Sequence, residues 1–342
     1  MRIGERGGIT RRMKNDGDAI RVTAELLEEM FLRILKYQLA GPVVLSERLL
    51  PKAIWCRRLM TIAIVHGLLR LKKTITKRDL YYLQKRLYGA QSTSDACLEW
   101  LASSLSSPRS TLRVVASARG IIVGDVTWKE GGQRINIKEF GSNGHLIPPS
   151  IDLFLADIDS SRIRAVIYVE KETIFFQIVA ARLHDRFPVA IITGKGFADL
   201  GTRELLASLS SRNLPIYGVV DADPFGVSIL ATLLGSQTRK NDAQMISRGV
   251  EWVGVRPSDL VAMGHLLNPT LLMCLSSTDR KRCESLLNRK DLPESWREEI
   301  RLMMELNLKA EIELLDAVKP NYLSNQILTK MLEERKWEVE SR

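Results

Sequence analysis

The sequence of 342 residues contains no long apolar run. Its most apolar stretches, AVIYV at 165–169 and PVAIIT at 188–193, are far shorter than the roughly 20 residues that a membrane-spanning helix needs. No apolar segment typical of a secretory signal follows Met1, because residues 1–22 are polar and rich in glycine and arginine. We therefore expect a flexible leader over residues 1–22, an intracellular protein and no membrane partner.

Cysteine and histidine are also scarce, with four residues of each. The cysteines form no CxxC pair and no cluster with histidine at zinc-finger spacing, which argues against a disulfide framework and a structural zinc site. We expect reduced core thiols. The glycine-rich GKGFADLGTR at 194–203 lacks the GK[ST] ending of a Walker A loop, so it gives no support for ATP binding by this chain.

Positive charge is abundant but unevenly distributed. Residues 1–150 hold 25 Lys and Arg against 13 Asp and Glu, whereas residues 151–342 hold 25 against 27. Within residues 51–90, ten basic residues accompany a single acid, Asp79. Such a concentration favours a nucleic-acid partner over a solvated face without one. A membrane surface is less suited, because the basic residues are spread over several short elements rather than one amphipathic helix.

The first part of the chain has the periodicity of helices followed by strands. Apolar residues at helical spacing predict helices over 23–39, 52–70 and 93–105, and a further helix after Thr76, which could cap it. TLRVVAS and IIVGDVTW around Arg119-Gly120 then predict a β-hairpin, and RINIKEF a third strand. Helices followed by a hairpin are typical of a winged helix, a common DNA-binding fold. GSNGHLIPPS at 141–150 is expected to be a linker between two domains.

Beyond the linker the pattern changes to buried strands that alternate with helices. Strands are expected in RAVIYVE, PVAIIT, LPIYGVVDAD and WVGV, and helices over 172–184, 201–211 and 225–235. This alternation predicts a parallel α/β sheet covered on both faces, followed by a mostly helical tail.

Three acids stand at the carboxyl ends of these strands, where functional groups gather in open α/β sheets. Glu170 ends the first strand, and Asp221 and Asp223 end the third, with a spacing that points both carboxylates to the same side. Oxygen ligands without nearby His or Cys suit Mg²⁺, with Mn²⁺ as the alternative metal. The competing interpretation is that Asp223 merely caps the helix that begins at Pro224.

The pair Tyr81-Tyr82 lies in the most basic part of the chain. A phenol with a pKa of about 10 is a poor nucleophile at neutral pH, but a neighbouring cation such as Arg78 or Lys77 could favour the phenolate. Because a helix turns about 100° per residue, the two side chains cannot share one role. The alternative is that both rings are core or interface aromatics.

Several motifs occur together and in one order: TKRDLYYLQ with LYGAQ, RSTLRVVASARGIIVG, VEKETIFFQ, GKGFADLGTR, DADPFG and WVGVRPSDL. Over about residues 50–330 they resemble the DNA topoisomerase VI A-subunit family, which includes a eukaryotic meiotic DNA double-strand-break protein. The resemblance implies an α/β protein with a winged-helix, CAP-like DNA-binding domain over 23–140. A metal-binding Toprim domain with a parallel sheet and a helical C-terminal extension would follow over 150–342.

The resemblance also assigns roles to residues. The family's nucleophile falls on Tyr82, which leaves Tyr81 for packing, and Arg78 matches the arginine beside the nucleophile. Glu170, Asp221 and Asp223 match the acids that hold Mg²⁺. The sequence departs from the family pattern at Ala198, where Pro is usual, at Arg119, where Lys is usual, and in LLGSQTRK at 233–240.

The implied reaction is transesterification that leaves protein on the 5′ end of a double-strand break. The implied partners are double-stranded DNA, a second protomer in a homodimer or pseudo-dimer, accessory break-formation proteins and a topoisomerase VI B-like subunit. We favour the meiotic protein and a nuclear location. The alternatives are the A subunit of a type IIB topoisomerase, a non-catalytic winged-helix protein and a Toprim nuclease that works without a tyrosine.

Overall fold

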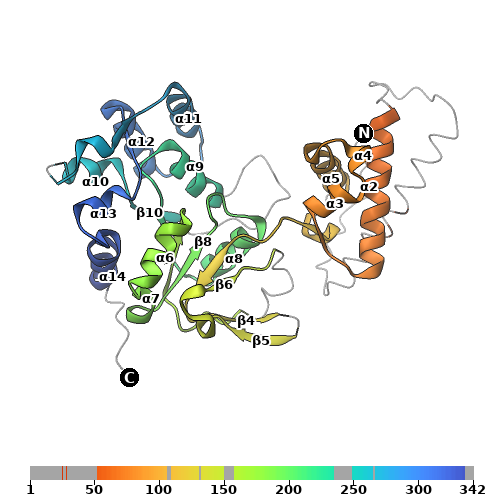
Figure 1. The fold of residues 1–342 in the computed structure, drawn as a ribbon, viewed down its shortest axis with the longest axis horizontal. Coiled ribbons are helices and arrows are strands. Elements are labelled where there is room, and N and C mark those ends of the chain that lie inside the picture. The colour runs from red at the N-terminus through yellow and green to blue at the C-terminus, as the bar shows by residue number, and fades with distance from the viewer. Residues whose placement is uncertain are drawn as a thin grey trace. The chain divides into compact units, whose positions relative to one another are not determined.

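The structure, a computed structural model, divides the chain into two compact units, which are described separately (Figure 1). The first unit ends at Ser117 and the second begins at Ala118. The described residues are 25, 28, 52–105, 109–130, 132–149, 158–234, 249–264 and 266–335. The predicted leader over 1–22 lies outside these ranges, and so does the predicted helix over 23–39, apart from Glu25 and Glu28, which are helical.

The first unit is mainly helical. Its elements are α2 (Lys52–Leu71), β1 (Ile75–Thr76), α3 (Lys77–Leu83), α4 (Lys85–Tyr88), α5 (Gln91–Leu105), the 3₁₀ helix η1 (Arg109–Leu112) and β2 (Val114–Val115). The helices predicted over 52–70, after Thr76 and over 93–105 are therefore confirmed. A core of buried side chains from α2, α3, α5 and η1 holds them together, with Leu80 and Leu101 fully buried.

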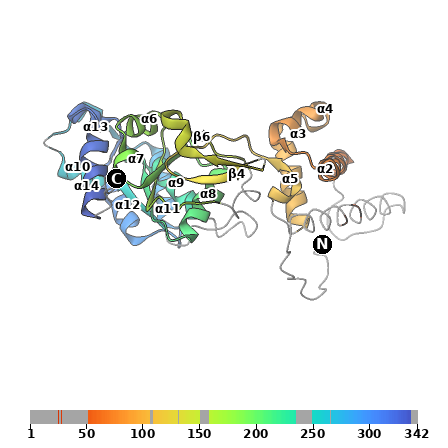
Figure 2. The ribbon, with the colours of Figure 1, turned by 90° about the horizontal axis from the view of Figure 1, so that it is seen from below.

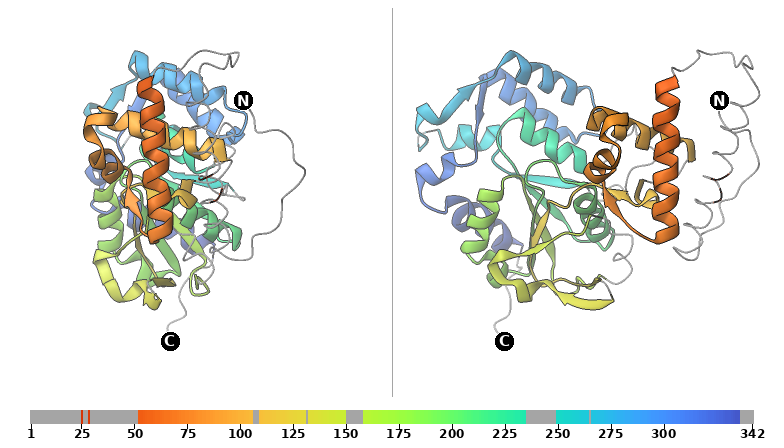
Figure 3. Two further views of the ribbon diagram at one scale, coloured as in Figure 1. Left: turned by 90° about the vertical axis from the view of Figure 1, so that its right-hand side faces the viewer. Right: turned by 45° about the vertical axis from the view of Figure 1, so that its right-hand side comes forward.

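The predicted hairpin around Arg119-Gly120 is wrong. β2 pairs in parallel with β1, whereas residues 121–123 form β3 (Ile121–Val123) in the second unit. Gly120 serves close packing rather than a turn, because a Cβ there would lie 2.0 Å from Oγ1 of Thr202. The predicted third strand pairs instead with residues 127–130, as the hairpin of β4 (Thr127–Glu130) and β5 (Gln133–Asn136), which extends from the second unit in Figure 3.

The boundary between the units also lies earlier in the chain than the predicted boundary at residues 140–150. The expected linker forms the end of the 3₁₀ helix η2 (Ile137–Asn143) and β6 (His145–Leu146), the strand that pairs with β3. Gly144 has a φ of +66°, and a Cβ there would lie 2.7 Å from Cγ2 of Ile121. The glycines that resemble a linker in sequence therefore allow the backbone to approach β3 closely.

The centre of the second unit is a six-stranded sheet in the order β10-β9-β7-β8-β3-β6. The four strands predicted from the apolar runs are confirmed: β7 (Ala165–Val169), β8 (Val189–Thr193), β9 (Ile216–Val219) and β10 (Val250–Gly254). They are parallel to one another, as expected, whereas β3 is antiparallel to both β8 and β6. Every residue of β7, β8 and β9 is buried.

Helices cover both faces of this sheet, as Figure 2 shows. Alternation along β7 sends Val166 and Tyr168 into one core and Ile167 and Val169 into the other. The first core is closed by α8 (Leu200–Ser211), α9 (Pro224–Leu233), α11 (Ser277–Leu287) and α12 (Glu294–Leu306). The second is closed by α6 (Glu172–Ala180), α7 (Leu183–Arg186), α10 (Pro257–Ala262), α13 (Leu314–Val318), the π-helix η5 (Leu323–Leu328) and α14 (Thr329–Glu334).

The C-terminal part is helical, as expected, but it also adds a short antiparallel pair. After the 3₁₀ helix η4 (Pro269–Leu271), β11 (Leu272–Cys274) pairs with β12 (Leu308–Ala310). Ala310 at the end of β12 forms an isolated bridge with Ala222, directly beside Asp221. None of the helices in the described ranges combines the length and the apolar character that crossing a membrane would require.

Candidate functional site

The sheet brings two of the predicted acids into contact. β7 and β9 are parallel neighbours, so their carboxyl ends meet at one edge, where Glu170 and Asp221 follow them. The backbone N–H of Asp221 donates to Oε2 of Glu170 over 3.1 Å, and both residues are buried, with 7% of their surface exposed. A hydrogen bond therefore fixes the Glu170 carboxylate against the end of β9.

Asp223 has the capping role that the alternative interpretation gave it. Its Oδ1 accepts a 2.6 Å hydrogen bond from the backbone N–H of Gly226 in the first turn of α9. The helix packs directly on the other two acids, because a Cβ on Gly226 would lie 2.8 Å from the Asp221 carbonyl oxygen and 3.1 Å from Oε2 of Glu170. The cap thus places the Asp223 carboxylate at the start of the helix that packs on Glu170 and Asp221.

The pKa values of all three acids are raised, because the carboxylates are buried and negative charges lie near one another. Burial, reinforced by the neighbouring charges of Asp221 and Asp223, raises the pKa of Glu170 to about 7. Burial also raises the pKa of Asp221, although the Ile312 N–H and Lys171 favour its charged form. The pKa of Asp223 is likewise raised by burial. Such a group of carboxylates is stabilised by a cation.

Lys171 supplies one positive charge at this place, and the sequence patterns did not single it out. Its Nζ lies 3.0 Å from Oδ2 of Asp221, 2.7 Å from Oε2 of Glu313 and 3.6 Å from Oε2 of Glu311. Burial acts to lower the pKa of Lys171, but these ion pairs outweigh it and raise the pKa. The only sequence signal was adjacency to Glu170, since Glu313 lies 142 residues further along the chain.

The residues present fit a hard divalent cation. Mg²⁺ in proteins is usually held by about one or two carboxylates together with water and substrate phosphates, and Glu170 with Asp221 offers that set. Within the described ranges, no three His, Cys, Asp or Glu side chains are arranged to hold a metal as they stand. Two of the acids are engaged by other groups: Oδ1 of Asp223 caps α9, and the Lys171 ammonium lies against Oδ2 of Asp221.

The glycine-rich turn at 194–203 belongs to the support of this site. The backbone N–H of Gly196 donates to the Glu170 carbonyl over 2.9 Å, and the buried Tyr168 hydroxyl donates to the Gly196 carbonyl over 2.8 Å. Asp199 caps α8 through the Thr202 N–H and also accepts from the Arg119 N–H. These contacts favour a tight strand-to-helix turn that braces Glu170.

In the first unit, α3 presents Tyr82 to solvent. Thr76 and Asp79 form a capping box at the start of α3, and fully buried Leu80 anchors the helix in the core. Tyr82 is 53% exposed, and the guanidinium carbon of Arg78, one turn earlier, lies 5.8 Å from the centre of its ring. The predicted neighbours Tyr82 and Arg78 are thus brought together.

The neighbouring tyrosines have different surroundings. The Tyr81 hydroxyl donates to the Gly89 carbonyl over 3.4 Å, and its ring packs at 5.3 Å from that of Tyr82. Tyr88 is buried, with its hydroxyl 2.8 Å from Oγ1 of Thr61. Of these three phenols, Tyr82 is the most exposed, in agreement with separate roles for Tyr81 and Tyr82.

The basic stretch around α3 divides into partly buried arginines that support the unit and exposed cations. Arg58 lies over the ring of Trp100 at 4.3 Å, and Arg57 donates to the Leu87 carbonyl, so both support the unit from within. The exposed cations are Arg70, Lys72, Lys73, Arg78, Lys85 and Arg86. The positive surface predicted from the sequence therefore persists on the first unit, although it is smaller than the residue count suggests.

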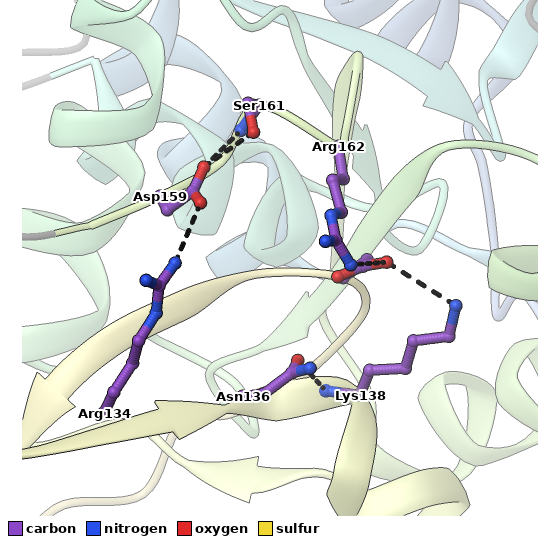
Figure 4. Close-up of polar contacts among 7 residues, drawn as sticks. Arg134, Asn136, Lys138, Asp159, Ser161 and Arg162 are labelled. Carbon is purple, nitrogen blue, oxygen red and sulfur yellow. Dashed lines mark hydrogen bonds and ion pairs between the residues drawn. The ribbon is translucent and has the colours of Figure 1, made fainter.

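A separate polar cavity of about 410 Å³ lies at the β4–β5 hairpin (Figure 4). Arg134 pairs with Asp159 at 3.2 Å, and Asp125 lies 3.6 Å from Arg162 and 3.5 Å from Lys138. Because acids and bases in this cavity neutralise one another, it carries little net charge to attract an ionic ligand.

The second unit, which carries the buried acids at the ends of its parallel strands, matches a Toprim family model. The model that describes the Toprim domain of the topoisomerase 6 A subunit and Spo11 matches residues 165–332, and the "Type IIB DNA topoisomerase" model matches residues 55–114. The chain therefore belongs to the family of Spo11 and the topoisomerase 6 A subunits.

Curated relatives agree with the family models. The chain is 34% identical over 281 residues to the A3 subunit of DNA topoisomerase 6 from Oryza sativa subsp. indica, a match that covers 81% of this chain and 63% of the relative. It is 32% identical to the DNA topoisomerase 6 A subunit of Arabidopsis thaliana, covering 81% of this chain and 65% of the relative. It is 31% identical to the meiotic recombination protein SPO11-1 of Oryza sativa subsp. indica, covering 81% and 73%. The chain thus spans less than two thirds of the topoisomerase subunits that it matches.

Proposed function

We propose that this chain is a DNA-cleaving transesterase that makes double-strand breaks and initiates meiotic recombination. The observation that carries the proposal is the placement of Tyr82. It is an exposed phenol on a capped and anchored helix, one turn from Arg78 and within the most basic part of the chain. Its exposure leaves the phenol open to a phosphate, and the surrounding cations suit a polyanion.

The chemistry follows from the phenol. Oη of Tyr82, which is exposed, gives its proton to water and attacks a backbone phosphorus, and a bond from Oη to phosphorus forms. The bond from phosphorus to the 3′ oxygen breaks, and the leaving oxygen takes a proton to become a 3′-hydroxyl. Arg78, whose guanidinium lies beside the Tyr82 ring, stabilises the charge on the phosphate. Since one phosphate ester replaces another, the break remains reversible.

Glu170 and Asp221, with Asp223 beside them, would hold Mg²⁺, or Mn²⁺ as the alternative. When bound, the metal neutralises charge on the phosphate and positions it. The buried hydrogen bond between Glu170 and the Asp221 backbone keeps the two carboxylates in register for that task. A Toprim domain is a metal-binding fold, which supports this assignment.

The first unit would bind double-stranded DNA as a module of the winged-helix type, with its exposed cations on the phosphates. Cutting both strands needs two tyrosines, so we propose a homodimer or pseudo-dimer, assisted by accessory break-formation proteins and a topoisomerase VI B-like subunit. Chromosomal DNA as substrate implies a nuclear location. The relatives named for meiotic recombination support this choice of pathway.

A second candidate function is that of the A subunit of a type IIB topoisomerase. The similarity to the plant topoisomerase 6 subunits, at 34% and 32% identity beside 31% for SPO11-1, supports it as well. Both candidates use the same tyrosine and acids. They differ in the fate of the break: a topoisomerase closes it after strand passage driven by an ATP-binding subunit.

Covalent capture tests the shared chemistry. The protein is denatured in cells that express it with its partners, unbound DNA is removed, and the 3′ ends of attached DNA are labelled. We expect label with the wild type and with Tyr81→Phe, and none with Tyr82→Phe. Equal label from wild type and Tyr82→Phe would exclude the nucleophile. Absence of label from the wild type would favour a non-catalytic DNA-binding protein.

A plasmid assay separates the two candidates. The purified complex is incubated with negatively supercoiled DNA and Mg²⁺, with and without ATP. Protein-linked linear DNA that persists in both conditions supports the meiotic function. Relaxed circles that appear only with ATP would establish the topoisomerase.

A further inference from the structure

Lys171 stands at the junction between the acids and a distant segment of the chain. It follows Glu170 and precedes α6 in an extended conformation, and it makes no side-chain cap of that helix. Its ammonium instead contacts Asp221 at 3.0 Å and Glu313 at 2.7 Å, with Glu311 at 3.6 Å. The Lys171 ammonium thus contacts three carboxylates, which come from two separate parts of the sequence.

The segment that carries Glu311 and Glu313 is fixed to Asp221 by its backbone. Ala310 and Ala222 exchange hydrogen bonds of 3.0 and 3.1 Å, and the Ile312 N–H donates to Oδ1 of Asp221 over 2.9 Å. The two oxygens of Asp221 therefore have separate partners: Oδ1 accepts from the backbone, and Oδ2 faces Lys171. A second cation at Asp221 has to compete with the ammonium for Oδ2.

From this arrangement we propose that Lys171 is the counter-ion of Asp221 in the metal-free protein. When a divalent cation binds Asp221, the Lys171 ammonium leaves Asp221 and stays paired with Glu313. The inference rests on the metal site of the proposed function. Lys171 is then a positioning residue, since it acts through Asp221. The exposure of the Glu313 side chain, 42% against 9% for Asp221, makes it the carboxylate better able to follow the moving ammonium.

Affinity for Mn²⁺, followed by electron paramagnetic resonance on the full-length protein, measures this competition without DNA cleavage. Lys171→Met removes the competing ammonium, so we expect Mn²⁺ to bind about tenfold more tightly. Glu313→Gln leaves Lys171 with Asp221 as its main partner, so we expect binding about threefold weaker. Glu311→Gln, which removes the same charge from the more distant and more exposed carboxylate, is the matched control and should change affinity less.

The double variant Lys171→Met/Glu313→Gln separates the proposal from a general effect of charge. If Glu313 acts by keeping the ammonium, Glu313→Gln has no effect once Lys171 is replaced. If Glu313→Gln weakens Mn²⁺ binding equally with and without Lys171, the proposal is wrong. It is also wrong if Lys171→Met binds Mn²⁺ more weakly than the wild type while unfolding like it. If Asp221→Asn binds Mn²⁺ as tightly as the wild type does, the metal site itself is refuted.

Discussion

The Glu170 carboxylate is buried, and the negative charges of two other carboxylates add to the cost of its ionised form. Its pKa of about 7 lies above the ordinary value of 4.5, so the folded state favours the protonated form. Stability in the absence of metal therefore falls as the pH rises through the interval from 4.5 to about 7, and it stays low above it. The residue that we assign to metal binding thus destabilises the metal-free fold at neutral pH.

Replacing Glu170 by Gln should stabilise the metal-free protein at pH 8, because Gln keeps an acceptor for the Asp221 N–H and carries no charge. We expect the free energy of unfolding to rise by about 2 kcal/mol at pH 8 and by less at pH 5. Urea unfolding in EDTA at both pH values measures this. Glu172→Gln, which replaces a half-exposed acid paired with Lys195, is the control. A loss of stability in Glu170→Gln at pH 8 would contradict the prediction.

The cysteines only partly match the expected core thiols. All four are free, but Cys56 and Cys274 are exposed, whereas Cys97 and Cys283 are buried. Burial raises the pKa of Cys283 to about 11. We expect iodoacetamide at pH 8 to modify Cys56 and Cys274 well before the buried pair, because the thiolate is the reactive form. Mass spectrometry of timed samples gives the order, and early modification of Cys283 in folded protein would be inconsistent with it.

At the scale of elements, the sequence predicts what depends on local pattern. Apolar runs located β7, β8, β9 and β10, and Thr76 marked the start of α3. Pairing between distant segments was not predictable in the same way. β3 lies beside β8, which starts far along the chain, and nothing in IIV at 121–123 specifies that partner. Its apolar character therefore suited a local hairpin equally well.

The same limit applied to the site. Strand ends located Glu170, Asp221 and Asp223, because the carboxyl edge of a parallel sheet is a local property of each strand. Lys171 was missed since its partners Glu311 and Glu313 come from the C-terminal segment. Their contact depends on the bridge between Ala222 and Ala310, which no periodicity reveals.

The first turn of α9 offers a test at this scale. Ala is normally the better helix residue by about 1 kcal/mol, so Gly67→Ala in α2, where a Cβ meets nothing within 4 Å, should stabilise the protein by up to about that amount. Gly226→Ala should instead destabilise it by about 1–3 kcal/mol, because the Cβ meets the Asp221 backbone and Glu170. We also expect weaker Mn²⁺ binding. Thermal unfolding compares the two, and a gain in stability for Gly226→Ala would contradict the close packing.

For the whole molecule, the boundary after Ser117 has a direct consequence. The second unit needs β3 and β6 as well as the four parallel strands, since β3 covers the edge of β8. A fragment of residues 118–342 should therefore fold, whereas a fragment of residues 141–342, which follows the boundary suggested by the sequence, should expose β8 and aggregate.

Circular dichroism, gel filtration and urea unfolding of the two fragments test this. We expect a cooperative transition and Mn²⁺ binding from residues 118–342. Without Tyr82, this fragment should form no covalent adduct with DNA. A well-folded fragment of residues 141–342 would show that β3 is dispensable and would return the boundary to the position expected from the sequence.

The bridge between Ala222 and Ala310 also orders events during synthesis. Helix α3 and strands β7 and β9 leave the ribosome well before the segment around Ile312. That segment supplies the hydrogen bond to Asp221 and the carboxylates that contact Lys171. A nascent chain thus completes the contacts of Asp221 and Lys171 last. A chain that ends before Ala310 would keep the helices of the first unit but would lack the backbone bridge to Ala222 and the hydrogen bond from Ile312 to Asp221.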